Sequence, residues 1–217
     1  SGSGWFCSGQ PASLLGNDSK GPANESDQAL TIISVGDAVG GTLTINGANF
    51  EFAPDQDFNG SASFTYILQD NGATSGLNDF LSSAANVSFT ITEVNDDPAG
   101  VNEELSSIAE DSGVRVIPFA SLLGGDSKGP ANESGQTLTI ISVGDAVGGS
   151  VTINDTDIEF TPEQDFNGTA RFSYTLQDNG TTNSVADFRT STANVSFTIS
   201  AINDVPSFTA GPTIVTT

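Results

Sequence analysis

Leu14 begins the stretch LLGNDSKGPANESDQALTIISVGDAVGG, which recurs from Leu122 as LLGGDSKGPANESGQTLTIISVGDAVGG. The two copies stay in register without insertion through Pro98 and Pro206, the prolines that close them. Self-similarity at one fixed offset is the signature of repeated domains, and each copy has the size of one domain. The repeat therefore predicts two tandem domains, residues 1–97 and 98–206, with 207–217 as the start of a further repeat or a tail.

Within each copy, short runs of β-branched or alternating residues predict strands. In the first copy these runs are Leu30–Val35, Thr42–Asn46, Asn49–Phe52, Ala62–Leu68 and Asn86–Ile91. Asn46-Gly47 predicts a hairpin turn between two of them, and no window has the apolar spacing of a helix. The pattern predicts an all-β chain of two tandem Ig-like antiparallel β-sandwich domains.

The two copies differ most in their opening segments. Val114–Ile117 predicts a first strand in the second copy, preceded by VNEELSSIAEDSG. The first copy has SGSGWFCSGQP in part of that place, so we expect its first strand to be atypical or incomplete.

The charge of the chain excludes several classes of partner. It has 27 acidic and 5 basic residues, a formal net charge of −22. Nucleic acid is excluded because almost no Lys or Arg could replace its counterions, and no polybasic patch offers binding to anionic lipid heads. No apolar stretch approaches 18 residues, so we expect no membrane insertion.

The residues that are missing restrict the chemistry further. The chain has no His, no Met and a single cysteine, Cys7. These absences exclude a disulfide framework, a thiolate zinc cluster and the usual Ser-His or Cys-His catalytic pairs, so we expect no enzyme. Acidic and nearly free of cysteine, the sequence is typical of an exported protein stabilised by hard cations.

Two motifs resemble cadherin repeats. The segment Glu93–Pro98, EVNDDP, resembles the D-x-N-D-N-x-P linker that closes a cadherin repeat, with Asp97 in place of the second Asn. Ala201–Pro206, AINDVP, keeps the Asn-Asp pair and the proline. PDQDFNG at Pro54–Gly60 is similar to the bacterial cadherin-like repeats of large surface adhesins. The resemblance implies extracellular, cell-surface stalks that are often stiffened by calcium.

The first linker also favours calcium on chemical grounds, because it places three carboxylates and one amide within five residues. These candidate ligands are Glu93, Asn95, Asp96 and Asp97. By the cadherin resemblance, Glu110 with Asp111 beside it serves a second cation at Asn203 and Asp204, and the first copy has Gly2 and Ser3 in the corresponding places. The alternative is a solvated acidic linker that binds no metal.

Other acidic clusters fit turns better than metal sites. Asp55–Gly60 and its counterpart in Pro162–Gly168 resemble half of an EF-hand loop, but the Glu that closes such a loop is absent and no helices flank it. We expect Asp and Asn side chains to cap backbone amides there, as at Asp70-Asn71-Gly72 and Asp178-Asn179-Gly180.

Together these features predict non-catalytic spacer repeats of an extracellular adhesin, rigidified by calcium at the interdomain linker. Two alternatives stay open: a filament subunit that exchanges a strand with its neighbours, and a polysaccharide-binding module. The expected partners are neighbouring repeats of the same chain, identical subunits or cell-surface glycans.

Overall fold

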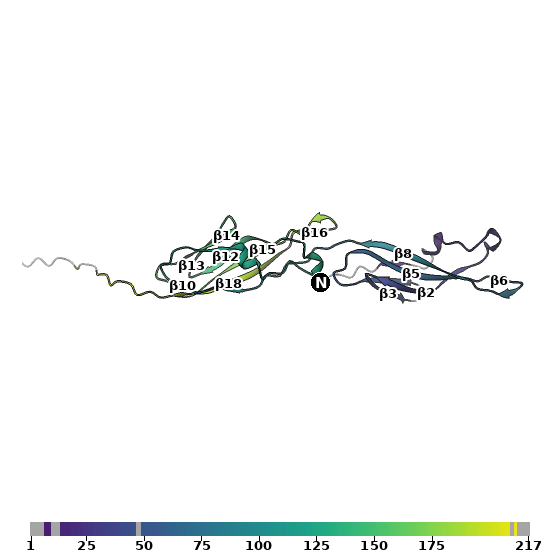
Figure 1. Ribbon diagram of the computed structural model, residues 1–217, viewed down its shortest axis with the longest axis horizontal. Helices are drawn as coiled ribbons and strands as arrows, with labels where there is room; N and C mark the ends of the chain where they lie inside the picture. Colours follow the sequence, from purple (N-terminus) through teal and green to yellow (C-terminus); the bar gives the residue numbers. More distant parts are fainter. Residues whose placement is uncertain (1–6, 10–13, 47–48, 209–210, 212–217) are drawn as a thin grey trace, which may run out of the picture. The chain divides into compact units, whose positions relative to one another are not determined.

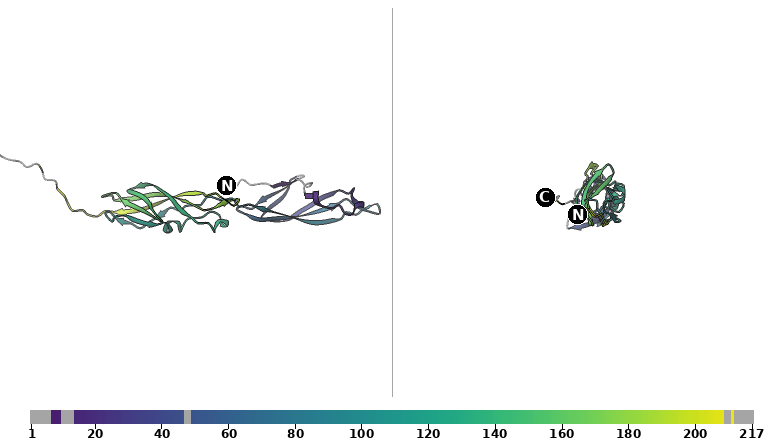
Figure 2. Two further views of the ribbon diagram at one scale, coloured as in Figure 1. Left: turned by 90° about the horizontal axis from the view of Figure 1, so that it is seen from above. Right: turned by 90° about the vertical axis from the view of Figure 1, so that its left-hand side faces the viewer.

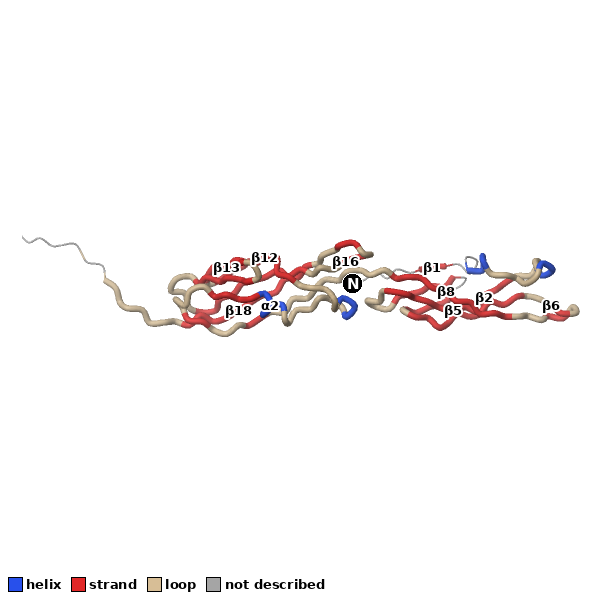
Figure 3. The backbone as a smooth tube through the Cα atoms, turned by 45° about the horizontal axis from the view of Figure 1, so that its top comes forward, coloured by secondary structure: helices blue, strands red, loops and turns tan. Residues whose placement is uncertain are grey.

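The computed structural model describes residues 7–9, 14–46, 49–208 and 211. Strands dominate it, and its helices are single turns (Figure 3). The chain forms two compact units: unit 1 comprises Ser1–Asn95, Pro130–Gly135 and Thr181–Asp187, and unit 2 comprises Asp96–Gly129, Gln136–Gly180 and Phe188–Thr217 (Figure 1). The domain boundaries expected from the repeat stay a prediction.

Unit 1 contains two three-stranded sheets with the orders β1-β4-β3 and β2-β5-β8. The first is formed by β1 (Cys7–Gly9), β4 (Asn49–Pro54) and β3 (Gly41–Asn46), and the second by β2 (Leu30–Val39), β5 (Gly60–Asp70) and β8 (Ser82–Ile91). Short hairpins add β6 (Ala73–Thr74) with β7 (Leu77–Asn78), and β16 (Thr181–Thr182) with β17 (Val185–Ala186). Single 3-10 turns lie at Leu15–Asn17, Ala23–Glu25 and Ala131–Glu133.

The core of unit 1 lies between these two sheets. Alternate residues of β5, namely Ala62, Phe64 and Tyr66, are buried, as the period of a strand requires. Phe64 meets Phe50 and Phe52 of the opposite sheet, at 6.0 and 6.5 Å between ring centroids. Phe52 also lies edge-on to Phe89 of β8, at 5.0 Å between centroids. The alternation seen in the sequence is therefore the inward face of a sandwich.

Unit 2 repeats this plan. One sheet has the order β11-β14-β13, and the other has the order β10-β18-β15-β12 with β9 also paired to β18. The strands run along the length of each unit (Figure 2). Their bounds are β9 Glu103–Glu104, β10 Ile108–Ala109, β11 Arg115–Pro118, β12 Thr139–Val147, β13 Gly149–Asn154, β14 Asp157–Pro162, β15 Gly168–Gln177 and β18 Thr190–Ser200, with helix α2 at Phe119–Leu123.

Aromatic packing between the sheets also holds the core of unit 2. Phe160 of β14 lies edge-on to Phe197 of β18, with 5.1 Å between the ring centroids. Arg115 covers the same Phe197 ring at 4.4 Å, and its guanidinium donates to the Ser106 carbonyl at 2.7 Å. Both units are thus antiparallel sandwiches, and the all-β Ig-like fold class is confirmed.

The first repeat has a short opening strand of three residues where the second has four, and whether it is incomplete stays a prediction. In unit 1, β1 pairs antiparallel with β4, Cys7 opposite Phe52, in the register that β11 adopts with Arg115 opposite Phe160. The dissimilar sequence hid this strand because backbone hydrogen bonds define its pairing, whatever side chains it carries. Gly2, Ser3 and most of the segment 207–217 lie outside the described residues, and no strand is assigned to the described part of that tail.

Candidate cation site

Glu110 is held at the end of unit 2 by the strand that precedes it. Strand β10 runs parallel to the end of β18, with Ile108 opposite Ile199. The Glu110 amide donates to the Ser200 carbonyl at 2.9 Å, and the Ile202 amide donates to Glu110 Oε1. The backbone therefore fixes this side chain just where the chain leaves β18.

The second oxygen of this carboxylate is in an unusual position. Glu110 is only 4% exposed, and its Oε2 is buried without a hydrogen-bond partner among the described residues. A buried carboxylate oxygen left unpaired is costly, whereas a bound cation or a proton would compensate its charge. Glu110 is therefore a group that lacks one partner.

Asp111, the residue after Glu110, is under the influence of several negative charges. The pKa of Asp111 is raised, first by desolvation and then by the negative charges of Asp204, Asp165 and Glu110. Asp111 has a left-handed backbone, with φ of 62°, in the turn that follows β10. Like charges disfavour ionisation of a neighbour, so three acidic side chains, Glu110, Asp165 and Asp204, lie within electrostatic reach of Asp111.

Asp165 reaches this cluster from a turn. The Phe166 amide donates to the Glu163 carbonyl at 3.2 Å, and Asp165 has φ of 58°. The sequence predicted a turn here and in the matching segment, where the Phe58 amide donates to the Asp55 carbonyl at 3.2 Å. Both recorded bonds join backbone groups, so the expected capping by Asp and Asn side chains stays a prediction. The sequence did not indicate that the charge of Asp165 acts on Asp111, because this approach depends on the tertiary fold.

Three residues of the second predicted site lie in one unit. Glu110, Asp111 and Asp204 all belong to unit 2 and interact through their charges. Asn203 is exposed and donates its side-chain amide to the Asp204 carbonyl at 3.4 Å. Their role as metal ligands stays a prediction.

The residues of the first predicted site have other partners. Glu93 accepts hydrogen bonds from the Thr181 hydroxyl and, through Oε1 at 3.3 Å, from the Ser184 amide. Asn95 is 3% exposed and donates its side-chain amide to the Asp187 carbonyl at 2.8 Å. All of these residues lie in unit 1.

The other two residues of that site begin unit 2, where Asp96 is half-buried and Asp97 is exposed. A calcium site that uses all four residues stays a prediction.

The chemistry of the donors around Glu110 fits a hard divalent cation. Carboxylate and amide oxygens are the ligands of calcium, and the charges acting on Asp111 are all negative. In the described part of the chain, no group of three or more Asp, Glu, His or Cys side chains is already gathered closely enough to hold a metal ion.

Other acidic residues have structural roles. Asp18 accepts the Tyr66 hydroxyl at 2.7 Å, and Asp70 Oδ1 accepts the amides of Gly72 and Leu81 at 2.9 and 3.1 Å. The predicted Asp70-Asn71-Gly72 turn is thus confirmed. None of the helices in the described residues has the length and apolar character that crossing a membrane requires.

Solved structures with related shapes include protocadherin gamma B2 extracellular cadherin domains 3–6, at 14% identity and a TM-score of 0.40 over 80% of this chain and 41% of that one. Chicken VE-cadherin EC1-2 matches at 15% identity and a TM-score of 0.33, over 81% and 85% of the two chains. An endo-fucoidan hydrolase of glycoside hydrolase family 107, MfFcnA4, matches at 19% identity and a TM-score of 0.30.

The match to the hydrolase covers 81% of this chain but only 24% of the hydrolase. Its low TM-score supports no statement about activity. No curated protein sequence matches the chain.

Family models match both copies of the repeat. Residues 8–78 match the model for a bacterial Ig domain, and residues 94–199 match the model for a cadherin-like domain. These matches confirm the resemblance read from the linker motifs. The chain is therefore similar to a bacterial Ig domain over residues 8–78 and to a cadherin-like domain over residues 94–199.

Proposed function

We propose that these repeats are non-catalytic spacers of an extracellular, cell-surface adhesin and that calcium stiffens them. The family matches support this role, because cadherin-like and bacterial Ig domains are modules of the extracellular adhesion type. The observation that supports calcium is the buried, unpartnered Oε2 of Glu110 beside Asp111, Asp165 and Asp204.

The residues that would hold the cation are Glu110, Asp111, Asp165 and Asp204, with Asn203 beside them. Calcium supplies a double positive charge that would compensate their repulsion and give the buried Glu110 oxygen a partner. Because Glu110 already fixes the backbone at Ile202, a cation bound there would tie the start of the repeat to its end. Such a tie stiffens the chain where it leaves the sandwich.

The same proposal covers the first linker, where Glu93, Asn95, Asp96 and Asp97 would hold calcium between the domains. Calcium bound there would fix the angle between neighbouring repeats. Glu93 and Asn95 already accept or donate hydrogen bonds, so their participation requires oxygens that remain available to a cation.

Calorimetric titration of calcium into the chain tests the site at Glu110. Extracellular modules bind calcium with dissociation constants on the order of 10⁻⁴–10⁻³ M, and we expect the same range here. Ten millimolar calcium is about 100 times the lower value and would stabilise the site by about 2.7 kcal/mol. Glu110→Gln should remove this binding event.

Asp155→Asn is the matched control, because Asp155 is an exposed turn residue with φ of 59° and the substitution removes the same charge. If Glu110→Gln binds calcium as the unchanged chain does, the site at Glu110 is refuted.

Small-angle scattering with calcium and with chelator, at matched ionic strength, tests the linker through Asp96→Ala. An unchanged maximum dimension in all samples would refute the stiffening.

A further inference from the structure

The two short hairpins of unit 1 have the same internal structure. In both, the two turn residues have left-handed backbones: Ser75 and Gly76 at φ of 54° and 81°, and Asn183 and Ser184 at φ of 51° and 62°. This is the pattern of a tight type I′ turn. Each hairpin is therefore a preformed unit that recurs at the repeat offset.

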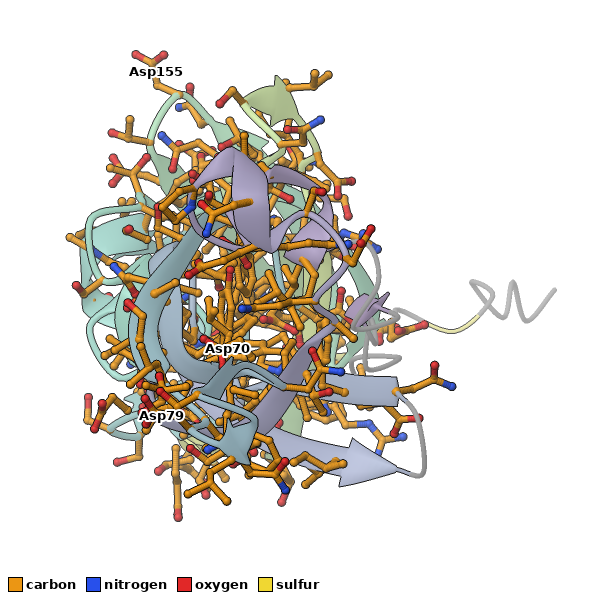
Figure 4. All side chains as sticks on the ribbon, turned by 90° about the vertical axis from the view of Figure 1, so that its right-hand side faces the viewer. Asp70, Asp79 and Asp155 are labelled. Atoms are coloured by element: carbon orange, nitrogen blue, oxygen red, sulfur yellow. The ribbon has the colours of Figure 1, made fainter. Side chains whose placement is uncertain are left out.

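Side-chain hydrogen bonds of the two hairpins also correspond. Thr74 donates to Asp79 Oδ2 at 2.7 Å, and Thr182 donates to Asp187 Oδ2 at 2.7 Å. At their bases, Asp70 Oδ1 and Asp178 Oδ1 each accept two backbone amides at 2.9–3.1 Å. Figure 4 views the end of unit 1 on which Asp70 and Asp79 lie.

One hairpin binds an extended segment of the chain. The Asn95 amide donates to the Thr182 hydroxyl oxygen at 2.9 Å, and the Asn95 side chain donates to the Asp187 carbonyl at 2.8 Å. The Asn183 amide donates to the Glu93 carbonyl at 3.1 Å. A Thr-turn-Asp hairpin thus binds a Val-Asn segment through both its backbone and its asparagine side chain.

The equivalent face of the other hairpin is open. Thr181, Thr182 and Asp187 are half-buried, whereas all residues of the hairpin 73–79 are exposed. The segment equivalent to Glu93–Asn95 is Ala201–Asn203, and it is exposed as well. Among the described residues, the hairpin 73–79 and the segment Ala201–Asn203 are therefore both exposed, and neither has the partner that its counterpart has.

Two substitutions between the copies favour binding of the exposed segment Ala201–Asn203 to the exposed hairpin 73–79. Glu93 bonds to the Thr181 hydroxyl in the occupied hairpin. Ala201 replaces the glutamate in the open segment, and Ala73 replaces the threonine in the open hairpin. Ala201 lying opposite Ala73 would leave no carboxylate or hydroxyl unpaired, and Thr74, Asp79 and Asn203 retain the other groups.

We propose that the hairpin 73–79 is a docking site for the segment Ala201–Asn203 of a second copy of this chain. The Asn203 amide would donate to the Thr74 hydroxyl oxygen, and the Asn203 side chain would donate to the Asp79 carbonyl. Copies would then associate head to tail, without calcium and without exchange of a core strand. Few hydrogen bonds are involved, so the isolated contact should have a dissociation constant on the order of 10⁻³ M.

The test titrates a synthetic peptide of residues 198–208, TISAINDVPSF, into the ¹⁵N-labelled chain with a chelator present. We expect saturable amide shifts at Thr74, Ser75 and Asp79. A peptide carrying Asn203→Ala should bind at least about ten times more weakly, because it loses the side-chain bond. Absence of shifts up to 5 mM peptide, or equal shifts with both peptides, would overturn the docking site.

A concentration series of the chain without peptide tests the second copy. The same amides should shift as the concentration rises, and Asn203→Ala in the full chain should abolish this dependence without unfolding, because Asn203 is exposed. Shifts that do not vary with concentration would overturn association between copies. Because the chelator removes calcium, failure of this proposal is distinguishable from failure of the calcium site.

Discussion

Tyr174 donates its hydroxyl to the carboxylate of Asp126, with 3.0 Å between the phenol oxygen and Oδ2. Tyr66 makes the equivalent bond to Asp18 in the other repeat, at 2.7 Å. Asp126 also accepts the Val101 amide at 2.7 Å. Tyr66 lies in β5 and Tyr174 in β15, whereas Asp18 and Asp126 lie in the segments that precede the neighbouring strands β2 and β12. These aspartates therefore stabilise their own sandwich.

The hydroxyls of Tyr66 and Tyr174 should therefore ionise at a higher pH than a free tyrosine does. Burial, the hydrogen bond to Asp18 and its charge raise the pKa of Tyr66 to about 12, and burial with Asp126 and Glu103 raises the pKa of Tyr174 further above 10. Because the folded-state pKa is raised, this stabilisation is complete below pH 10 and is lost as the pH rises through 12. Ultraviolet absorbance should show no tyrosinate at pH 10.5 while the protein is folded.

The chain has only these two tyrosines, so Tyr66→Phe isolates the signal of Tyr174. Circular dichroism at each pH confirms that the protein is still folded. Ionisation of either tyrosine near pH 10 in the folded state would contradict the two hydrogen bonds.

Gly148 of unit 2 should tolerate no side chain without a loss of stability. It has φ of +79°, and an added Cβ would lie 2.4 Å from the ring of Phe166. Gly148→Ala combines backbone strain with overpacking, so it should lower the free energy of unfolding by about 2–4 kcal/mol. Urea unfolding of unit 2 measures this change.

Gly144→Ala is the matched control in the preceding strand. Its added Cβ would meet the Ser173 hydroxyl at 3.6 Å, an ordinary contact. We expect a change below about 1 kcal/mol there. Equal losses in the two variants would show that the Phe166 contact is not decisive.

The sequence was sufficient for the strands and for part of the site. Alternation at Ala62–Leu68 predicted β5, because one face of a sandwich strand is buried and the other is not. Glu110 was found through its spacing from the linker in the cadherin resemblance. Both signals are local patterns with a fixed period or distance along the chain.

The rest depended on contacts between distant segments. The charge of Asp165 acts on Asp111 across 54 residues of sequence, which only the tertiary fold can bring about. Asn95 was expected to be a metal ligand, yet its side chain donates to the Asp187 carbonyl, 92 residues away. No local pattern in a single sequence encodes such a pairing.

Asp165 should contribute to cation binding, although the sequence did not predict it as a ligand. Asp165→Asn removes one of the charges that act on Asp111, while asparagine keeps the left-handed turn. We expect calcium affinity to fall by about tenfold, which corresponds to about 1.4 kcal/mol. Calorimetry against Asp155→Asn separates this from a general loss of charge, and an unchanged affinity would exclude Asp165.

Asn95 should control the protection of the hairpin that it binds. Asn95→Ala removes the bond to the Asp187 carbonyl and leaves that half-buried group without the side-chain donor, which costs about 1–3 kcal/mol locally. Amide hydrogen exchange of Thr182 and Asp187 should therefore accelerate by about ten- to a hundredfold.

The internal reference for this measurement is the open hairpin 73–79, which has the same turn and the same Thr-Asp bond. Its exchange should not respond to Asn95→Ala, and its rates give the level that the occupied hairpin approaches once its partner is removed. Val94→Ala is the second reference, because Val94 is 51% exposed and lies beside Asn95. If Asn95→Ala and Val94→Ala accelerate exchange equally, the Asn95 side chain does not stabilise the hairpin. The docking site at Thr74 and Asp79, which was inferred from that interaction, would then lose its structural basis.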